Sequence, residues 1–153
     1  MNKTITHSEL VEKSEKWLRR NGFPVTLNEK IIAVTEHGEQ PDVLGFNSRT
    51  SILLEIKVSR NDFLSDAKKP FRTEPEKGVG DWRFYVCPEG LITIDDLPEG
   101  WGLIYLKGRK LEPVYGWPGN VFWGTRKPFQ SNQTAEKDYM YSLLRRLAKN
   151  KAF

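Results

Sequence analysis

Cysteine and histidine are scarce in this sequence of 153 residues, which holds one cysteine, Cys87, and two histidines, His7 and His37. A single cysteine excludes an intramolecular disulfide and a cysteine-rich zinc cluster. Two histidines also disfavour a metal site built mainly from imidazoles. Carboxylates remain available, and their oxygens suit a hard divalent cation.

Long apolar runs are also missing. No stretch approaches the roughly 20 consecutive apolar residues that a membrane-spanning helix needs. The N-terminal residues lack the charged-then-apolar order of a signal peptide. We therefore expect a cytoplasmic protein without membrane contact. The net charge of +4 is compatible with a nucleic-acid partner but does not identify one.

The patterning that is present predicts alternating helices and strands. Apolar spacing predicts a helix over 6–20, which Thr6 and Glu9 open as a capping box. Ser59 caps a second helix, and a third spans 133–149. β-branched and aromatic residues predict strands at 24–27 and 30–35 (one bent or two short), 51–58, 81–87, 101–106 and 111–114. This order predicts one α/β domain over 1–153, with a central mixed sheet flanked by helices.

Residues 41–58 carry the motif around which we interpret the chain. Successive side chains of a strand point to opposite faces, so Glu55 and Lys57 share a face opposite Ile56. Asp42 lies 13 positions before Glu55, a spacing that lets one strand end, turn and return beside its neighbour. Two acids and a lysine would then converge. The alternative is a structural salt bridge between Glu55 and Lys57, with Asp42 as a turn residue.

This D…ExK arrangement resembles the PD-(D/E)XK superfamily of nucleases, which have the restriction-endonuclease-like fold. The resemblance implies a metal-dependent DNA endonuclease or repair-type nuclease. Asp42, Glu55 and the main-chain carbonyl of Ile56 would hold Mg²⁺, with Mn²⁺ as a substitute, and Lys57 would position the attacking water. It also implies an acid from the first helix near the metal, for which Glu9 is the candidate, although the capping box explains Glu9 without a metal.

A looser resemblance, carried by the residues from Lys57 to Phe63, is to the MmcB-like DNA-repair branch of the superfamily and to related phage-borne proteins. DNA is accordingly the expected partner. The candidate contacts with DNA lie in the segment after the motif and on the next predicted strand: Ser59, Arg60, Lys68, Lys69, Arg72, Arg83 and Tyr85. The alternative is an exposed helix end and loop for Lys68, Lys69 and Arg72, and a solvent-facing strand edge for Arg83 and Tyr85.

Two further expectations concern function. A non-catalytic module that binds nucleic acid or a protein partner on the same fold is the alternative to the nuclease. Cutting both strands of a duplex with one site per domain would require a homodimer.

Aromatic and basic residues alternate over 115–130, and we expect these rings to pack onto the core more than to grip a nucleic-acid strand.

Overall fold

The computed structural model describes residues 4–119 and 122–151. The strands form one six-stranded sheet in chain order: β1 (Val25–Asn28), β2 (Val43–Phe46), β3 (Ser51–Ile56), β4 (Trp82–Pro88), β5 (Gly102–Lys107) and β6 (Lys110–Tyr115). The α-helices are α1 (His7–Arg20), α2 (Arg60–Asp66), α3 (Pro70–Thr73) and α4 (Gln133–Lys149), with short 3₁₀ turns at Pro75–Lys77 and Ile94–Asp96. The predicted α/β class with a central mixed sheet flanked by helices is confirmed.

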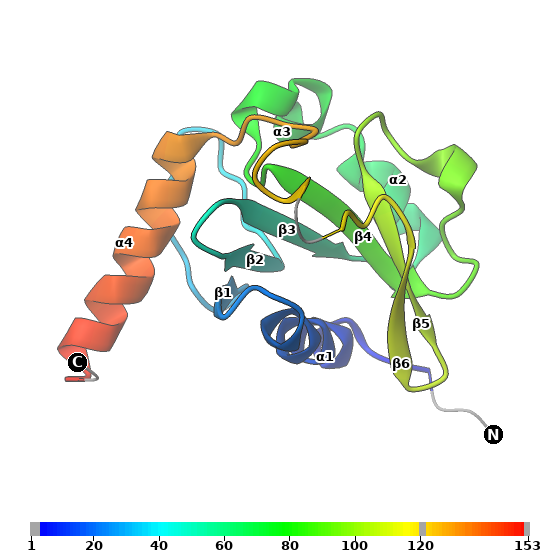
Figure 1. Cartoon of the computed structure of the whole chain (residues 1–153), viewed down its shortest axis with the longest axis horizontal. Coiled ribbons are helices and arrows are strands. Elements are labelled where there is room, and N and C mark those ends of the chain that lie inside the picture. Colours follow the sequence, from blue (N-terminus) through cyan, green and yellow to red (C-terminus); the bar gives the residue numbers. More distant parts are fainter. Residues whose placement is uncertain (1–3, 120–121, 152–153) are drawn as a thin grey trace.

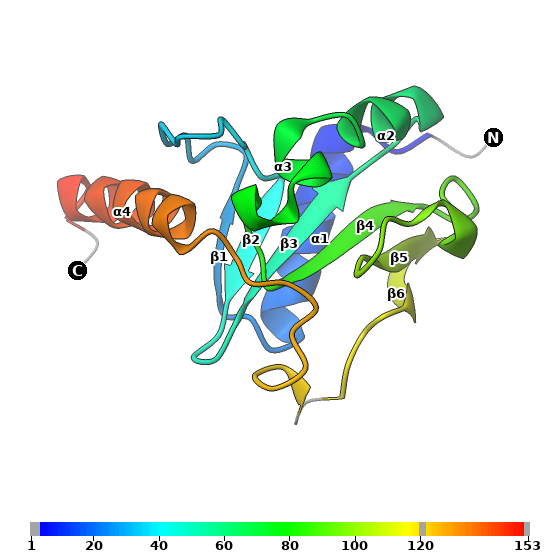
Figure 2. The same ribbon diagram turned by 90° about the horizontal axis from the view of Figure 1, so that it is seen from above.

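The sheet is antiparallel at both ends and parallel in the middle. β1, β2 and β3 form an antiparallel meander, β3, β4 and β5 are parallel, and β6 returns antiparallel to β5. Helix α1 covers one face and α2 and α3 cover the other (Figures 1 and 2). The alternation of side chains along β3 explains both layers. On one face, Ile52 and Leu54 pack with Leu10 and Leu18 of α1. Leu53, on the opposite face, packs with Phe63 of α2.

The helix starts predicted from the sequence are confirmed, and a side chain caps each of them. Thr6 accepts the N–H of Glu9 at the start of α1, and Ser59 accepts the N–H of Asp62 at the start of α2. The side chain of Asn132 caps α4 in the same way by accepting the N–H of Ala135. Each cap satisfies an amide that would otherwise lack a partner inside the helix.

The strand predicted over 30–35 is wrong. Only Val25–Asn28 forms a strand in this region, and the chain from Lys30 to Gln40 runs as turns and irregular backbone. Ile32 and Val34 are 74% and 95% exposed. Their β-branched side chains suggested a strand, but β-propensity mostly reflects packing against a half-buried surface, and here no such surface is offered.

Rings of the segment after β6 pack onto the core, as expected, with Trp117 and Trp123 on the α1 side of the sheet and Phe129 on the opposite side. Trp123 is buried and meets Trp82 edge-on at 4.9 Å between ring centroids, while the indole N–H of Trp82 donates to the carbonyl of Trp123 at 3.0 Å. Trp117 lies 5.1 Å from Trp17 of α1. Such contacts combine a large apolar burial with a favoured ring geometry. The prediction over 115–130 extends across residues 120 and 121, which lie outside the described residues.

Helix α4 is attached to the sheet mainly through its first turns and extends away from it (Figure 1). Its buried residues are Ala135, Glu136 and Tyr139. The Glu136 carboxylate accepts the hydroxyl of Ser51 at 2.7 Å and the N–H of Gly80 at 2.9 Å, and it also accepts the hydroxyl of Ser131. Across the described ranges, none of these helices has the length and apolar content needed to cross a membrane.

Candidate functional site

Asp42, Glu55 and Lys57 come together at one edge of the sheet. The antiparallel register pairs Val43 with Leu54, so the next residues outward, Asp42 and Glu55, lie side by side. The Asp42 carboxylate accepts the main-chain N–H of Ile56 at 2.8 Å. The N–H of Lys57 donates to Val86 of β4 at 2.9 Å, which fixes the motif against the next strand. The predicted convergence of these residues is therefore present.

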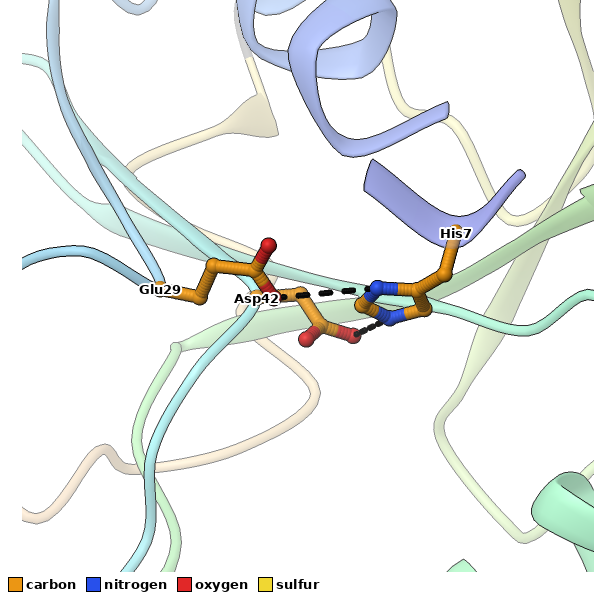
Figure 3. Close-up of side chains that lie close together, drawn as sticks. All are labelled: His7, Glu29 and Asp42. Atoms are coloured by element: carbon orange, nitrogen blue, oxygen red, sulfur yellow. Dashed lines mark ion pairs between the residues drawn. The ribbon is translucent and has the colours of Figure 1, made fainter. Parts of the chain in front are cut away.

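Helix α1 adds a histidine to this edge (Figure 3). His7 Nε2 lies 3.4 Å from Asp42 Oδ2, and His7 Nδ1 lies 3.7 Å from Glu29 Oε2. One ligand atom from each of the three side chains falls within 4.8 Å of the others. The hydrogen bond with Asp42, opposed by partial burial, raises the pKa of His7 above its usual range. These donors form a partly exposed set that can bind a divalent metal.

Glu55 lies on the inner side of Asp42 and is 4% exposed. Burial, and then the negative charge of Asp42, raise the pKa of the Glu55 carboxyl to about 8. Two carboxylates held this close repel each other until a cation offsets their charge. A divalent cation between Asp42 and Glu55 would lessen that repulsion, but among the described residues the donors within 4.8 Å of one another are those of His7, Glu29 and Asp42, without Glu55.

The two donor sets at Asp42 favour different metals. Asp42 and Glu55 offer oxygen alone, which suits Mg²⁺. Asp42, Glu29 and His7 add an imidazole nitrogen, which Mn²⁺ and other transition metals accept more readily. For Ile56 the structure places the amide N–H against Asp42, and the role of its carbonyl as a ligand stays a prediction.

Lys57 and Glu55 also belong to a buried ion network. The ammonium of Lys57 lies 3.7 Å from Glu55 Oε2 and 3.4 Å from Asp66 Oδ1. Arg72, 2% exposed, contacts three carboxylates: Glu39 at 2.6 Å, Asp66 at 2.8 Å and Glu55 at 3.4 Å. Burial of Asp66 works against its charged form, but the charges of Arg72 and Lys57 and the hydrogen bonds from Tyr85 and Arg72 together outweigh it, so the pKa of Asp66 is lowered. The network holds Lys57 and Glu55 in fixed positions.

Three of the predicted DNA contacts, Arg72, Arg83 and Tyr85, are wrong, because the structure buries their side chains. Arg72 is enclosed by carboxylates instead of facing solvent. Arg83 is 1% exposed, and its guanidinium donates to the carbonyls of Gly80, Pro75 and Gly78. Tyr85 is fully buried, and its hydroxyl donates to Asp66 at 2.6 Å. Arg83 and Tyr85 face the layer formed by α2 and α3. No local sequence pattern indicated that this layer covers that face of β4.

The other predicted contacts remain on the surface. Arg60 forms an ion pair with Asp96 at 2.7 Å and also donates to the carbonyl of Leu91. Ser59 serves as the cap of α2. Lys68 is exposed, and Lys69 lies 3.4 Å from Asp66. These four residues stay candidates for contact with DNA, although Arg60 would first have to leave Asp96.

Glu9 is not brought to the metal-binding edge. It accepts the hydroxyl of Thr6 at 3.1 Å and lines a groove on the side of α1 that faces β6. His7, two residues earlier, is the α1 residue that contacts Asp42. Successive helix residues are about 100° apart around the axis, so both cannot point the same way. The expectation that Glu9 completes the site is therefore corrected in favour of His7.

Sequence reasoning missed other members of the site. Glu39 is 2% exposed, and its carboxylate accepts from Arg72 and from the N–H of Val79. Glu29 and Asp66 had been given no role at the site. The usable signal was weak: Asp66 and Arg72 lie six positions apart around a helix end, a spacing that many exposed pairs share.

Comparison with known proteins supports the fold but identifies no function. No protein-family model matches the chain, and no curated protein matches it. One solved structure that resembles it is a protein of unknown function from Silicibacter pomeroyi, with 23% identity and a TM-score of 0.65. The alignment covers 95% of this chain and 90% of that one. A likeness at this level of identity shows that the two proteins share a fold across nearly their whole lengths.

Proposed function

We propose that this protein is a metal-dependent nuclease that hydrolyses phosphodiester bonds in DNA. The observation that carries the proposal is the meeting of Asp42, Glu55 and Lys57 at one edge of the sheet, across strands β2 and β3. The fold supports it, because a central mixed sheet flanked by helices is what the resemblance to PD-(D/E)XK nucleases implies.

The residues have distinct parts in the proposed chemistry. Asp42 and Glu55, with the carbonyl of Ile56 or the imidazole of His7, would hold Mg²⁺ or Mn²⁺. The bound ion would polarise the phosphodiester and lower the pKa of a coordinated water. Lys57 would hold the attacking water through its ammonium, which Glu55 and Asp66 keep in place. A fixed positive charge beside developing negative charge stabilises the transition state without reorganisation.

One observation favours the alternative, a non-catalytic nucleic-acid-binding or partner-binding module. The Glu55 carboxylate already has two cationic neighbours, Arg72 at 3.4 Å and Lys57 at 3.7 Å. A site compensated by its own side chains can persist as a structural ion network. On this alternative Asp42 and Glu55 would bind no metal, and nucleic acid would bind without being cut.

A cleavage assay tests the proposal. Purified protein would be incubated with supercoiled plasmid and with labelled single-stranded, duplex and branched DNA, in Mg²⁺, Mn²⁺ or EDTA. Lys57→Ala and Asp42→Asn are the test variants, and Lys137→Ala, an exposed lysine of α4, is the matched control. We expect metal-dependent cleavage in the wild type and the control, and none in the test variants. Full metal-dependent activity in either test variant would exclude the assignment.

A further inference from the structure

A groove of about 720 Å³ runs between α1 and the hairpin of β5 and β6, outside the carboxylate cluster. Its α1 wall carries Lys13, Lys16 and Arg20, whose spacings of three and four residues place them along one helix face. Arg109 and Lys110 enter from the opposite wall, at the hairpin turn. Five cations from two separate elements thus face the same space as two acids of α1, Glu9 and Glu12, which leaves an excess of positive charge in the groove.

Most of this positive charge is uncompensated. Lys16 forms an exposed ion pair with Glu12 at 3.1 Å. Within 4–119 and 122–151, the side chains of Lys13, Arg20, Arg109 and Lys110 have neither an ion pair nor a hydrogen bond. Like charges gathered without partners raise the local concentration of anions. The groove therefore offers an anionic ligand several contacts that cost no existing interaction.

The groove also contains an aromatic ring. Trp17 lines it, is partly exposed, and packs against Trp117, whose ring centroid is 5.1 Å away. A supported indole between basic side chains suits a base, which stacks on the ring while its phosphates meet the cations. An acidic peptide would use the charges and leave the ring without a stacking partner.

The topology places this groove beside the carboxylates. Strands β3, β4 and β5 are parallel, so the turn that follows β5 lies at the same edge of the sheet as Lys57, which follows β3. Helix α1 begins at this edge, where His7 contacts Asp42. At about 1.5 Å per residue, Lys13 lies roughly 9 Å and Arg20 roughly 20 Å along the helix from His7.

We infer that the groove between α1 and the β5–β6 turn binds a single strand of nucleic acid that continues from the Asp42–Glu55 edge. This inference rests on the proposed nuclease function and identifies a single-stranded segment as the part of the substrate held beside the site. The phosphates would contact Lys13, Arg20, Arg109 and Lys110, and a base would stack on Trp17.

The test is binding without cleavage. Fluorescence anisotropy would follow a labelled single-stranded oligonucleotide of about 15 nucleotides in EDTA. The double variant Lys13→Glu/Arg109→Glu is compared with Arg145→Glu/Lys149→Glu, which makes the same charge change on exposed positions of α4. We expect affinity to fall on the order of ten-fold or more in the groove variant and to remain within about two-fold of wild type in the control. Trp17→Leu, which keeps an apolar contact for Trp117, should weaken binding several-fold.

The outcomes separate this inference from the proposed function. Binding is measured in EDTA, and the groove lies outside the metal site, so the result does not depend on whether Asp42 and Glu55 bind a metal. Equal losses in the two double variants, or no binding by the wild type, would overturn the inference even if metal-dependent cleavage is observed. Polyglutamate that binds as tightly as the oligonucleotide, with the same loss in the groove variant, would overturn it in favour of an acidic protein partner.

Discussion

The carboxylate of Asp42 accepts the main-chain N–H of Ile56 at 2.8 Å, so the acid that precedes β2 is tied to the residue between Glu55 and Lys57. Asn at position 42 can still accept this hydrogen bond through its amide oxygen, but it removes the charge that a metal needs. The substitution therefore separates the structural role of Asp42 from its proposed role as a ligand.

We predict that Mn²⁺ stabilises the wild type and has little effect on Asp42→Asn. A ligand that binds only the folded state adds about 2.7 kcal/mol at a concentration 100 times its Kd. The measurement is thermal unfolding in EDTA and over a MnCl₂ series. Asp62→Asn, which alters an exposed acid of α2, is the control and should respond to Mn²⁺ as the wild type does. An equal rise in Tm for Asp42→Asn would mean that the ion binds elsewhere.

The second prediction concerns Arg72, whose guanidinium contacts Glu39, Asp66 and Glu55 while 2% exposed. Arg72→Met fills similar space but leaves the buried carboxylates without their shared cation. Breaking a buried ion pair from one side costs about 3–5 kcal/mol, so a loss of that size in the free energy of unfolding is expected. Urea denaturation measures it.

Two companion variants sharpen the Arg72 experiment. Arg60→Ala removes an exposed ion pair with Asp96 and should have a much smaller effect, because solvent already screens that pair. Adding Glu39→Gln to Arg72→Met should recover part of the lost stability, since Glu39 is buried and Arg72 is its ion-pair partner, so its uncompensated charge is removed. If Arg72→Met is as stable as the wild type, the network contributes nothing to folding.

Local sequence features predicted most of the fold. Capping residues marked the helix starts, and alternation assigned Ile52, Leu54 and Ile56 to one face and Leu53, Glu55 and Lys57 to the other. The meeting of Asp42 and Glu55 was also predictable, because a short antiparallel return fixes which residues become neighbours. These inferences depend on residues that are close in the chain.

The rest depends on contacts between distant segments. Glu39 and Arg72 are 33 positions apart, and no local pattern distinguishes this pair from two solvated charges. Arg83 and Tyr85 looked like the exposed face of a strand, but α3 and the following turn cover that face and supply acceptors for the guanidinium. The strand predicted at Ile32 and Val34 was wrong in the opposite sense, because both side chains lie largely exposed instead of packing in a sheet.

The third prediction concerns the attachment of α4. The buried carboxylate of Glu136 accepts from Ser51, Gly80 and Ser131, which belong to three separate segments. Glu136→Ala leaves the hydroxyls of Ser51 and Ser131 without this acceptor, while the N–H of Gly80 keeps the Ser131 oxygen as a second acceptor at 3.0 Å. Each unsatisfied buried group costs about 1–3 kcal/mol, although water will reach some of them. We expect a loss of at least about 2 kcal/mol in urea denaturation. Glu136→Gln keeps an acceptor oxygen and should lose less.

A control on the far part of α4 completes that test. Leu144→Ala alters a side chain that is 54% exposed in the same helix. It should leave the urea midpoint near that of the wild type, since the outer turns of α4 bury little. Equal destabilisation by Leu144→Ala and Glu136→Ala would show that the whole length of the helix contributes to folding, contrary to the contacts of its first turns.

The fourth prediction uses Cys87, which is fully buried in β4. Burial raises the pKa of its thiol to about 11 from an ordinary value of 9.0. Because the thiolate is the reactive form, the native protein should not react with a disulfide reagent such as DTNB at pH 8. One thiol per chain should react after unfolding in guanidinium. Rapid modification of the native protein would mean that β4 opens readily.

The same pKa sets a pH dependence of stability. In the window between about 9 and 11, the unfolded chain releases the Cys87 proton while the folded protein retains it. The contribution of the thiol to stability is therefore complete below the unfolded pKa and is lost as the pH rises toward the folded value. Other buried groups titrate in this range, so the comparison is with Cys87→Ala, measured by urea denaturation at several pH values. The wild type should lose stability more steeply with pH than Cys87→Ala, and parallel curves would contradict the buried, protonated thiol.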